Sequence, residues 1–355
     1  MKVVGLITEY NPFHNGHKFH MEEAKRVTNA DHVIVVMSGN FVQRGTPAII
    51  NKYSRAKMAL ICGADLVFEL PVCFSTGSAE YFALGAVSLL NQLGIVDEIC
   101  FGSEYSDIHE LISIARILSE ESLEYKSFLC NFMKKGITFP LARTQALKML
   151  IPEMKEEMLS SPNSILGIEY LKALIKLKSK IKPISITRKN AGYHDETLAD
   201  SVFNAISSAT AIRKSITTTN SLDTIKHHVP SEVFNILEKE YNRTFPITEN
   251  DYTLLLQYKL MEESKESLVR YLDINQDIAN RIKNTNISSF HFSELAQEIK
   301  SKQWTLTRVN RALLHVLLRI TSANMELYKK EGYTQYARIL GVRKDSTFLL
   351  RQMKE

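Results

Sequence analysis

Two histidines with phosphate-binding potential, His14 and His17, stand in a short turn that follows an apolar run from Val3 to Thr8. If the run is a buried strand and the turn opens a helix, the first amides of that helix lack partners within it and attract phosphate. Both imidazoles would then face one phosphate chain and donate hydrogen bonds as charge develops on it. Gly16 lets the backbone approach the ligand closely. We therefore predict that His14 and His17 are catalytic residues of an ATP-binding turn.

Two other interpretations of this histidine pair stay open. A His-x-x-His pair on a helix can be half of a metal site, although no HExxH motif or carboxylate-rich segment completes one here. Alternatively, the pair only caps a helix in a structural turn. We expect no metal site built by the protein itself.

A second segment with phosphate-binding residue types lies at Ile206 to Arg213. Its hydroxyls, on Ser207, Ser208 and Thr210, can bind phosphate oxygens together with free amides at a helix start. Arg213 adds a guanidinium that suits the β- and γ-phosphates of a nucleotide. Taken alone, the segment is equally consistent with a serine-rich helix cap.

The elements that must position these residues alternate between strand and helix through the first half of the chain. Continuous apolar strands separated by helices are typical of a parallel sheet covered on both faces. We predict a Rossmann-like, doubly wound α/β fold, in which ligands bind beyond the carboxyl ends of the strands. The predicted strands are Val3 to Thr8, His32 to Met37, Leu66 to Leu70, Glu98 to Gly102 and Ile184 to Thr187, and the predicted helices are Asn15 to Thr28, Ser54 to Gly63 with a serine N-cap, and Ser78 to Leu93.

The predicted domain boundaries lie where the alternation of strands and helices stops. The pattern is wholly helical from Ile108 to Lys180, so residues 1–220 are expected to form a catalytic domain with a helical insertion at about 108–180. Beyond Thr217 we expect helices and no strand, and residues 221–355 are predicted to form a helical RNA-binding domain.

Positive charge is concentrated at the C-terminal end of this chain of 355 residues, whose net charge is +5. Residues 301–355 contain 11 Lys and Arg against 4 Asp and Glu, whereas residues 1–300 contain 33 basic and 35 acidic residues. Such asymmetry indicates a polyanionic partner. The helical pattern from Thr305 to Ile320 places four cationic residues on one face, which we predict to bind RNA; the alternative is a solvated face of a structural helix. They are Arg308, Arg311, His315 and Arg319.

The remaining composition is that of an ordinary globular protein. No window approaches the roughly 18 uninterrupted apolar residues of a membrane span, and the four cysteines form no Cys-x-x-Cys pair. Reduced, buried thiols are typical of the cytoplasm, which is the location we expect. The oligomeric state is left open.

The turn at His14 to His17 resembles the HxGH signature of the nucleotidylyl transferase superfamily, and Ile206 to Arg213 resembles its Ile-Ser-Ser-Thr-x-x-Arg motif with an extra alanine before the threonine. Three further runs narrow the likeness, which extends over essentially the whole length, to the bacterial tRNA(Met) cytidine acetate ligases. These runs are Glu9 to His17, Met37 to Gly45 and Gly63 to Pro71.

This resemblance implies a reaction and a set of contacts. ATP and acetate would form acetyl-adenylate, with Mg²⁺ screening the phosphates, and the acetyl group would pass to N4 of the wobble cytidine of elongator tRNA(Met). Asn40, Gln43 and Arg44, which follow the second predicted strand, rank below the ATP turn as residues that orient substrate. The implied ATP contacts are Ile7, Thr8, Glu9, Tyr10, Asn11, Pro12, Phe13, His14, Asn15, Gly16, His17, Lys18, Phe19, His20, Gly102, Asn163 and Arg188, to which we add Ser207, Ser208, Thr210 and Arg213.

Two alternatives come from other classes of function. An adenylyltransferase of the same fold would act on a small phosphorylated metabolite, although it would not need the long helical second half. A nucleotide-sensing RNA-binding protein would keep the fold without catalysis, although both histidines of the signature are present.

Overall fold

The computed structural model describes residues 1–105, 107–187, 197–198 and 205–353. Its centre is a six-stranded sheet in the order β7-β6-β1-β2-β5-β8. The first five strands are parallel, and β8 runs antiparallel to β5. The predicted doubly wound α/β fold is therefore confirmed, with each predicted strand within two residues of its observed bounds. The strands are β1 Val3–Thr8, β2 His32–Ser38, β5 Leu66–Leu70, β6 Glu98–Ser103, β7 Lys182–Thr187 and β8 Arg338–Val342.

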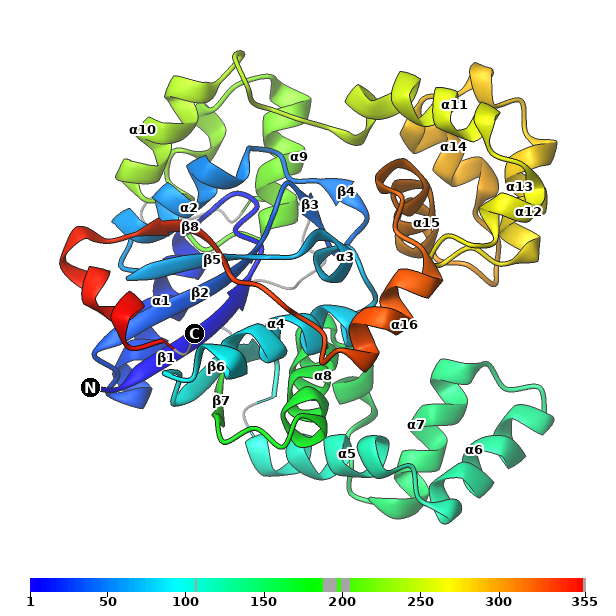
Figure 1. The fold of residues 1–355 in the computed structure, drawn as a ribbon, viewed down its shortest axis with the longest axis horizontal. Helices are drawn as coiled ribbons and strands as arrows, with labels where there is room; N and C mark the ends of the chain where they lie inside the picture. The colour runs from blue at the N-terminus through cyan, green and yellow to red at the C-terminus, as the bar shows by residue number, and fades with distance from the viewer. Residues whose placement is uncertain (106, 188–196, 199–204, 354–355) are drawn as a thin grey trace.

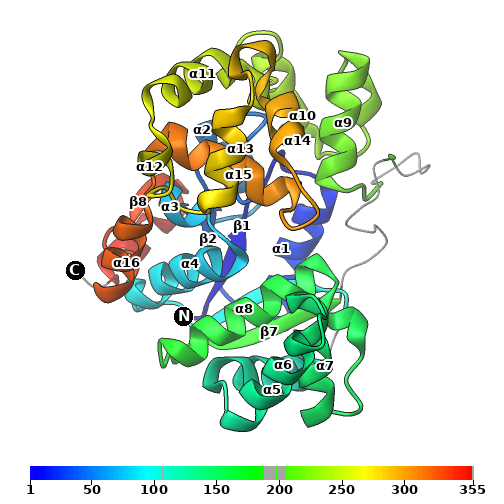
Figure 2. The ribbon, with the colours of Figure 1, turned by 90° about the vertical axis from the view of Figure 1, so that its right-hand side faces the viewer.

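Helices cover both faces of the sheet, and each face has its own core (Figures 1 and 2). Apolar side chains alternate between the faces along each strand, so that Val3 joins one core and Val4 the other. Both faces are thereby buried, which explains the unbroken apolar runs of the sequence. One core includes α1 Asn15–Thr28, α2 Lys52–Ile61, α9 Ala209–Thr219 and α10 Ser231–Glu240, and the other includes α4 Ala79–Leu93.

The predicted helical insertion lies between β6 and β7. Its last helix, α8, packs on α4 and α5, whereas α6 and α7 pack on each other and project from the sheet (Figure 1). The insertion consists of α5 Ile108–Glu120, α6 Leu123–Lys134, α7 Phe139–Leu150, a 3-10 turn at Glu156–Leu159 and α8 Pro162–Lys176.

A helical unit with a separate core follows α10 and projects on the same side as α6 and α7 (Figure 1, right). Leu256, Leu260, Leu295 and Leu313 are among its buried residues. None of the helices in the described part of the chain is long and apolar enough to cross a membrane. The unit contains α11 Thr253–Glu262, α12 Lys265–Leu268, α13 Gln276–Asn284, α14 Phe292–Ile299 and α15 Leu306–Leu318.

Two expectations about the elements are wrong. The chain does not stay helical after Thr217, because after α16 (Ser322–Lys330) it returns to the sheet and adds β8 beside β5. This edge strand is short and half-exposed, so it lacks the apolar run that marked the buried strands. The second helix begins two residues before the predicted Ser54, since the Asn51 side chain accepts a hydrogen bond from the Ser54 amide at 2.9 Å and is the N-cap. The domain boundary near residue 220 stays a prediction.

Candidate active site

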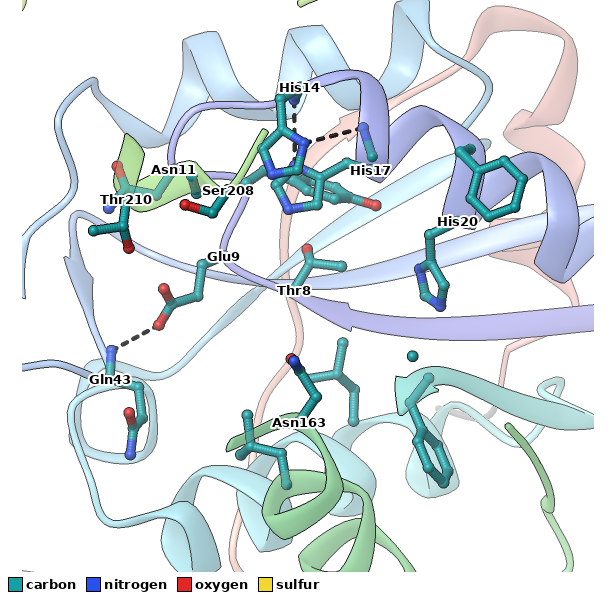
Figure 3. A pocket seen from close by; sticks show the side chains of 18 of the residues that line it. Thr8, Glu9, Asn11, His14, His17, His20, Gln43, Asn163, Ser208 and Thr210 are labelled. Atoms are coloured by element: carbon teal, nitrogen blue, oxygen red, sulfur yellow. Dashed lines mark hydrogen bonds between the residues drawn. The ribbon is translucent and has the colours of Figure 1, made fainter. Parts of the chain in front are cut away.

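A cavity of about 250 Å³ opens beyond the carboxyl ends of β1, β6 and β7, where ligands bind in doubly wound sheets (Figure 3). The turn after β1 forms one side, and the start of α9 lies next to it. The β6 end and α8 form the opposite side. The lining residues are Ile7, Thr8, Glu9, Tyr10, Asn11, His14, Gly16, His17, Phe19, His20, Gln43, Arg44, Phe82, Phe101, Gly102, Asn163, Leu166, Tyr170, Ile186, Thr187, Ile206, Ser208, Ala209, Thr210 and Arg213.

His14 and His17 lie side by side at the first turn of α1. Their rings stack with centroids 3.6 Å apart. His14 Nδ1 accepts a hydrogen bond from the Gly16 amide at 3.1 Å, and His17 Nδ1 accepts one from the His14 amide at 3.3 Å. An Nδ1 that accepts carries no proton, so both neutral rings hold their proton on Nε2. The two rings therefore cap the helix through Nδ1, as one interpretation of the sequence predicted, and an Nε2–H group is the kind of donor that the other interpretation requires. Phosphate binding by His14 and His17 stays a prediction.

The start of α9, which carries the second phosphate-type motif, lies next to the turn that carries the first. Ser208 is the N-cap of α9, and its hydroxyl accepts a hydrogen bond from the Ala211 amide at 3.0 Å. Arg213 Nη1 donates to the main-chain oxygen of Asn11 at 2.7 Å, and Nη2 donates to the Thr210 hydroxyl at 3.3 Å. The starts of α1 and α9 thus converge on one cavity, as predicted, and both helix dipoles favour negative charge there.

The opposite wall is mostly apolar, and of its residues the sequence analysis predicted only Gly102 and Asn163. Leu166 and Tyr170 follow Asn163 on α8, and the Phe101 ring lies 5.7 Å from that of Tyr170. Asn163, Leu166 and Tyr170 are spaced three and four residues apart, so a helical wheel of α8 would have placed them on one face. An apolar wall with a few polar groups is a suitable surface for a nucleobase.

Several of the predicted ATP contacts lie outside the cavity lining. Phe13 is fully buried in the core, and Pro12 also lies outside. Asn15 Nδ2 donates to main-chain oxygens of Ala205 and His227 at 3.1 and 2.8 Å, so this side chain ties α1 to the segment around α9. Lys18 lines a neighbouring hollow.

Two further predicted contacts also lie apart from the cavity lining. The Ser207 hydroxyl is 2.9 Å from His228 Nδ1 and lies beneath the α9 start. Arg188 is outside the described residues.

Hydrogen bonds join the turn after β1 to a hairpin of β3 (Phe41–Val42) and β4 (Thr46–Pro47). Glu9 Oε1 accepts from the Gln43 amide at 2.9 Å, and Asn11 Oδ1 accepts from the Ile49 amide at 2.7 Å (Figure 3). The hairpin brings Gln43 and Arg44 to the cavity. The prediction from sequence ranks both residues below those of the turn.

Arg55, which the sequence analysis missed, lies fully buried beneath the turn and the hairpin. Its guanidinium binds main-chain oxygens, and burial lowers its pKa to about 10. Nothing in the sequence distinguishes this arginine from a surface residue of α2, because its partners are backbone groups from distant segments. Its acceptors are Ile50 at 3.0 Å, Glu9 at 2.6 Å, Ser38 at 3.0 Å, and Gly39.

Comparison with known proteins identifies the family to which the chain belongs. The family model described as HIGH Nucleotidyl Transferase matches residues 1–355. The tRNA(Met) cytidine acetate ligase of Acetivibrio thermocellus is 44% identical over 361 residues, which cover 100% of this chain and 86% of the relative. That of Clostridium novyi is 41% identical, with 100% and 88% covered. The chain belongs to the tRNA(Met) cytidine acetate ligase family of HIGH nucleotidyl transferases.

Solved structures of this ligase family have the same fold. The crystal structure of apo Thermotoga maritima TmcAL (form I) superimposes with a TM-score of 0.91 at 35% sequence identity, covering 99% of this chain and 83% of the other. The structure of that protein bound with alpha-thio ATP gives a TM-score of 0.88 with the same coverage. A nucleotide analogue has thus been captured in this fold.

The basic face predicted on α15 is only partly exposed. His315 is fully buried, with Nε2 3.0 Å from the Thr76 oxygen and Nδ1 3.0 Å from the Leu272 oxygen, and burial lowers its pKa. The predicted exposure of His315 is therefore wrong. The helix packs against the protein on two sides rather than one, because α3 (Val72–Ser75) ends against it at Thr76. Arg311 is 11% exposed and pairs with Asp273 at 2.9 Å.

The other two cations of α15 keep more solvent contact. Arg308 is 37% exposed, with its guanidinium 4.3 Å from the centre of the Trp304 ring, and Arg319 is exposed at the end of the helix. RNA contact by the four predicted residues stays a prediction.

The role of Arg55 can be tested by substitution. We expect Arg55→Met to lower the free energy of unfolding by about 3–5 kcal/mol, because buried carbonyl groups lose their charged donor. Arg55→Lys should lose less, since the ammonium keeps the charge but lacks the planar fork. Urea denaturation measures both, with exposed Arg116→Met on α5 as the control. Equal stability of Arg55→Met and the control would contradict this role.

Proposed function

We propose that this protein is an ATP-dependent ligase that activates acetate as acetyl-adenylate and transfers the acetyl group to N4 of the wobble cytidine of elongator tRNA(Met). The observation that carries the proposal is the convergence of the α1 and α9 starts, with the stacked His14 and His17, on one cavity that has an apolar wall opposite. Identity of 40–44% to ligases of this name, over 100% of this chain and 86–88% of the relatives, supports it.

The site suits adenylation of a carboxylate. An acetate oxygen attacks the α-phosphorus of ATP, and the bond from that phosphorus to the pyrophosphate oxygen breaks. Negative charge builds on the phosphoryl oxygens and on the departing pyrophosphate. The Nε2–H groups of His14 and His17 and the α1 amides stabilise this charge, and Arg213 lies beside the turn to bind the outer phosphates. The cytidine N4 then attacks the acetyl carbon, the bond from that carbon to the phosphate oxygen breaks, and AMP leaves as N4 loses one proton to solvent.

Mg²⁺ is proposed to accompany the phosphates of ATP. This ion is usually held by substrate oxygens, water and one or two carboxylates. Glu9 is the one carboxylate among the described residues that line the cavity. Bound Mg²⁺ would neutralise charge on the leaving pyrophosphate.

The RNA is proposed to approach over α15, which lies next to the ATP cavity. The β3–β4 hairpin packs directly on this helix, since a Cβ added at Gly45 would lie 2.3 Å from the Arg311 amide nitrogen. The same hairpin carries Gln43 and Arg44 into the cavity. Arg308 and Arg319 are the more exposed cations of α15 and are the proposed phosphate contacts. A cytoplasmic location fits a tRNA substrate and stays a prediction.

The reaction is tested by incubating the protein with ATP, labelled acetate and bulk tRNA. We expect the label in one modified cytidine, as N4-acetylcytidine, with AMP and pyrophosphate as products. Mass spectrometry of nuclease digests locates the label. Label that stays in small molecules would favour the metabolite adenylyltransferase, and nucleotide binding without turnover would favour the non-catalytic RNA-binding protein.

The two histidines are tested by ATP–pyrophosphate exchange. We expect His14→Ala or His17→Ala to slow acetate-dependent exchange by about 10²-fold or more, because each removes a donor to developing charge. Affinity for tRNA should change little, since neither ring lies on α15. His109→Ala, an exposed histidine on α5, is the matched control. Exchange at the control rate in either variant would contradict the catalytic assignment.

The exposed cations of α15 are tested by the salt dependence of tRNA binding. Reversing Arg308 and Arg319 to Glu should weaken binding and reduce the slope of log K against log salt by about 2, since roughly one counterion is released per phosphate contact. Lys239→Glu on α10 serves as a control for charge alone. An unchanged slope would show that α15 is a structural helix.

A further inference from the structure

A carboxylate with no assigned role, Glu104, lies just behind the apolar wall of the cavity. It follows β6 and faces the first turn of α8. Its Oε2 accepts hydrogen bonds from the Ser164 amide at 3.1 Å and the Ser164 hydroxyl at 2.9 Å. Its Oε1 accepts from Asn163 Nδ2 at 2.5 Å. Both carboxylate oxygens are therefore occupied by α8, whose N-terminal dipole favours a negative charge there.

This contact decides which end of the Asn163 amide faces the cavity. An ionised carboxylate only accepts hydrogen bonds, so the group that it holds must be the NH₂ of the amide. The carbonyl oxygen, Oδ1, is then the end left for a ligand. No described residue donates to Oδ1. Figure 3 shows Asn163 pointing into the cavity from the side opposite His14 and His17.

We propose that Glu104 is a positioning residue that fixes Asn163 with its oxygen toward the nucleoside of ATP, so that Asn163 reads a hydrogen-bond donor. That donor is the adenine 6-amino group or a ribose hydroxyl. The inference rests on the proposed function, because it requires ATP in this cavity. It extends that function by assigning the choice of nucleoside to a carboxylate that does not itself reach the ligand.

Glu104 disfavours the rotated orientation of the Asn163 amide. A rotated Asn163 would present its NH₂ to the ligand and bring its oxygen against the carboxylate, an arrangement with two acceptors and no proton between them. The rotated form would favour a ligand with an acceptor at the same place, such as the O6 of guanine. Holding the amide in one orientation therefore favours donor groups and disfavours acceptors.

A purely structural role for Glu104 is the competing explanation. Ser161, the N-cap of α8, makes no side-chain capping bond, and Glu104 takes over that function at the Ser164 amide. A cap alone affects stability and leaves nucleotide preference unchanged. The two explanations therefore differ in one readout, the ratio of affinities for ATP and for analogues that lack one donor.

The test uses calorimetric titration of the full chain with ATP, purine riboside triphosphate, 2′-deoxy-ATP and 3′-deoxy-ATP. The wild-type protein should bind one of these analogues about tenfold more weakly than ATP, which is the loss of one well-placed hydrogen bond. The analogue that shows the loss identifies whether the base or the ribose is read. In Glu104→Ala, ATP should bind about as weakly as that analogue, and the tenfold ratio should approach one.

Three further variants complete the experiment. Asn163→Ala should abolish the same ratio, whereas Glu104→Gln, which keeps the size and can still accept from Asn163, should retain part of it. Glu120→Ala, an exposed glutamate on α5, should behave as wild type. Thermal unfolding of each variant separates loss of the α8 cap from loss of preference.

Two results would overturn the inference while leaving the proposed function intact. One is a wild-type protein that binds ATP and all three analogues equally, and the other is a Glu104→Ala protein that keeps the full ratio. A wild-type protein that binds no ATP would overturn the proposed function together with this inference.

Discussion

The carboxyl ends of β1 and β2 turn into loops whose main-chain oxygens need donors, and the buried guanidinium of Arg55 supplies them. A planar fork with five N–H groups can hold carbonyls from several segments at once, which no neutral side chain does. The free-energy cost of burying this charge is offset because each accepting main-chain carbonyl is a dipole held in place by the fold. The ATP turn and the hairpin at its side therefore keep a common geometry, and His14, His17, Gln43 and Arg44 reach the cavity from them.

Sequence patterns predicted the parts of this molecule that depend on local order. The buried strands followed from continuous apolar runs, and the phosphate-type motifs followed from residue types at helix starts. The partners of Arg55 and the burial of His315 could not be predicted in this way, because both depend on segments far apart in the chain. The edge strand β8 was missed for a related reason, since half-exposed edge strands lack an apolar signature.

The two sides of the cavity come from different parts of the fold. The starts of α1 and α9 offer donors suited to phosphates, and both lie on the helix layer of one sheet face. The apolar wall comes from the end of β6 and from α8, the last helix of the insertion. The Phe101 ring would lie 2.6 Å from a Cβ added at Gly167, so α8 packs against β6 at the distance that glycine permits. The insertion thus completes the cavity.

The antiparallel strand β8 also has a consequence for folding. Its register pairs Leu66 with Val342, residues far apart along the chain, and the helical unit of α11 to α15 lies between them in sequence. During synthesis, β5 therefore has an open hydrogen-bonding edge until Val342 and its neighbours have left the ribosome. Contacts of such long sequence separation form slowly. The pairing of β8 with β5 tethers the helical unit at both of its ends, which restrains its position beside the cavity more than a single linker would.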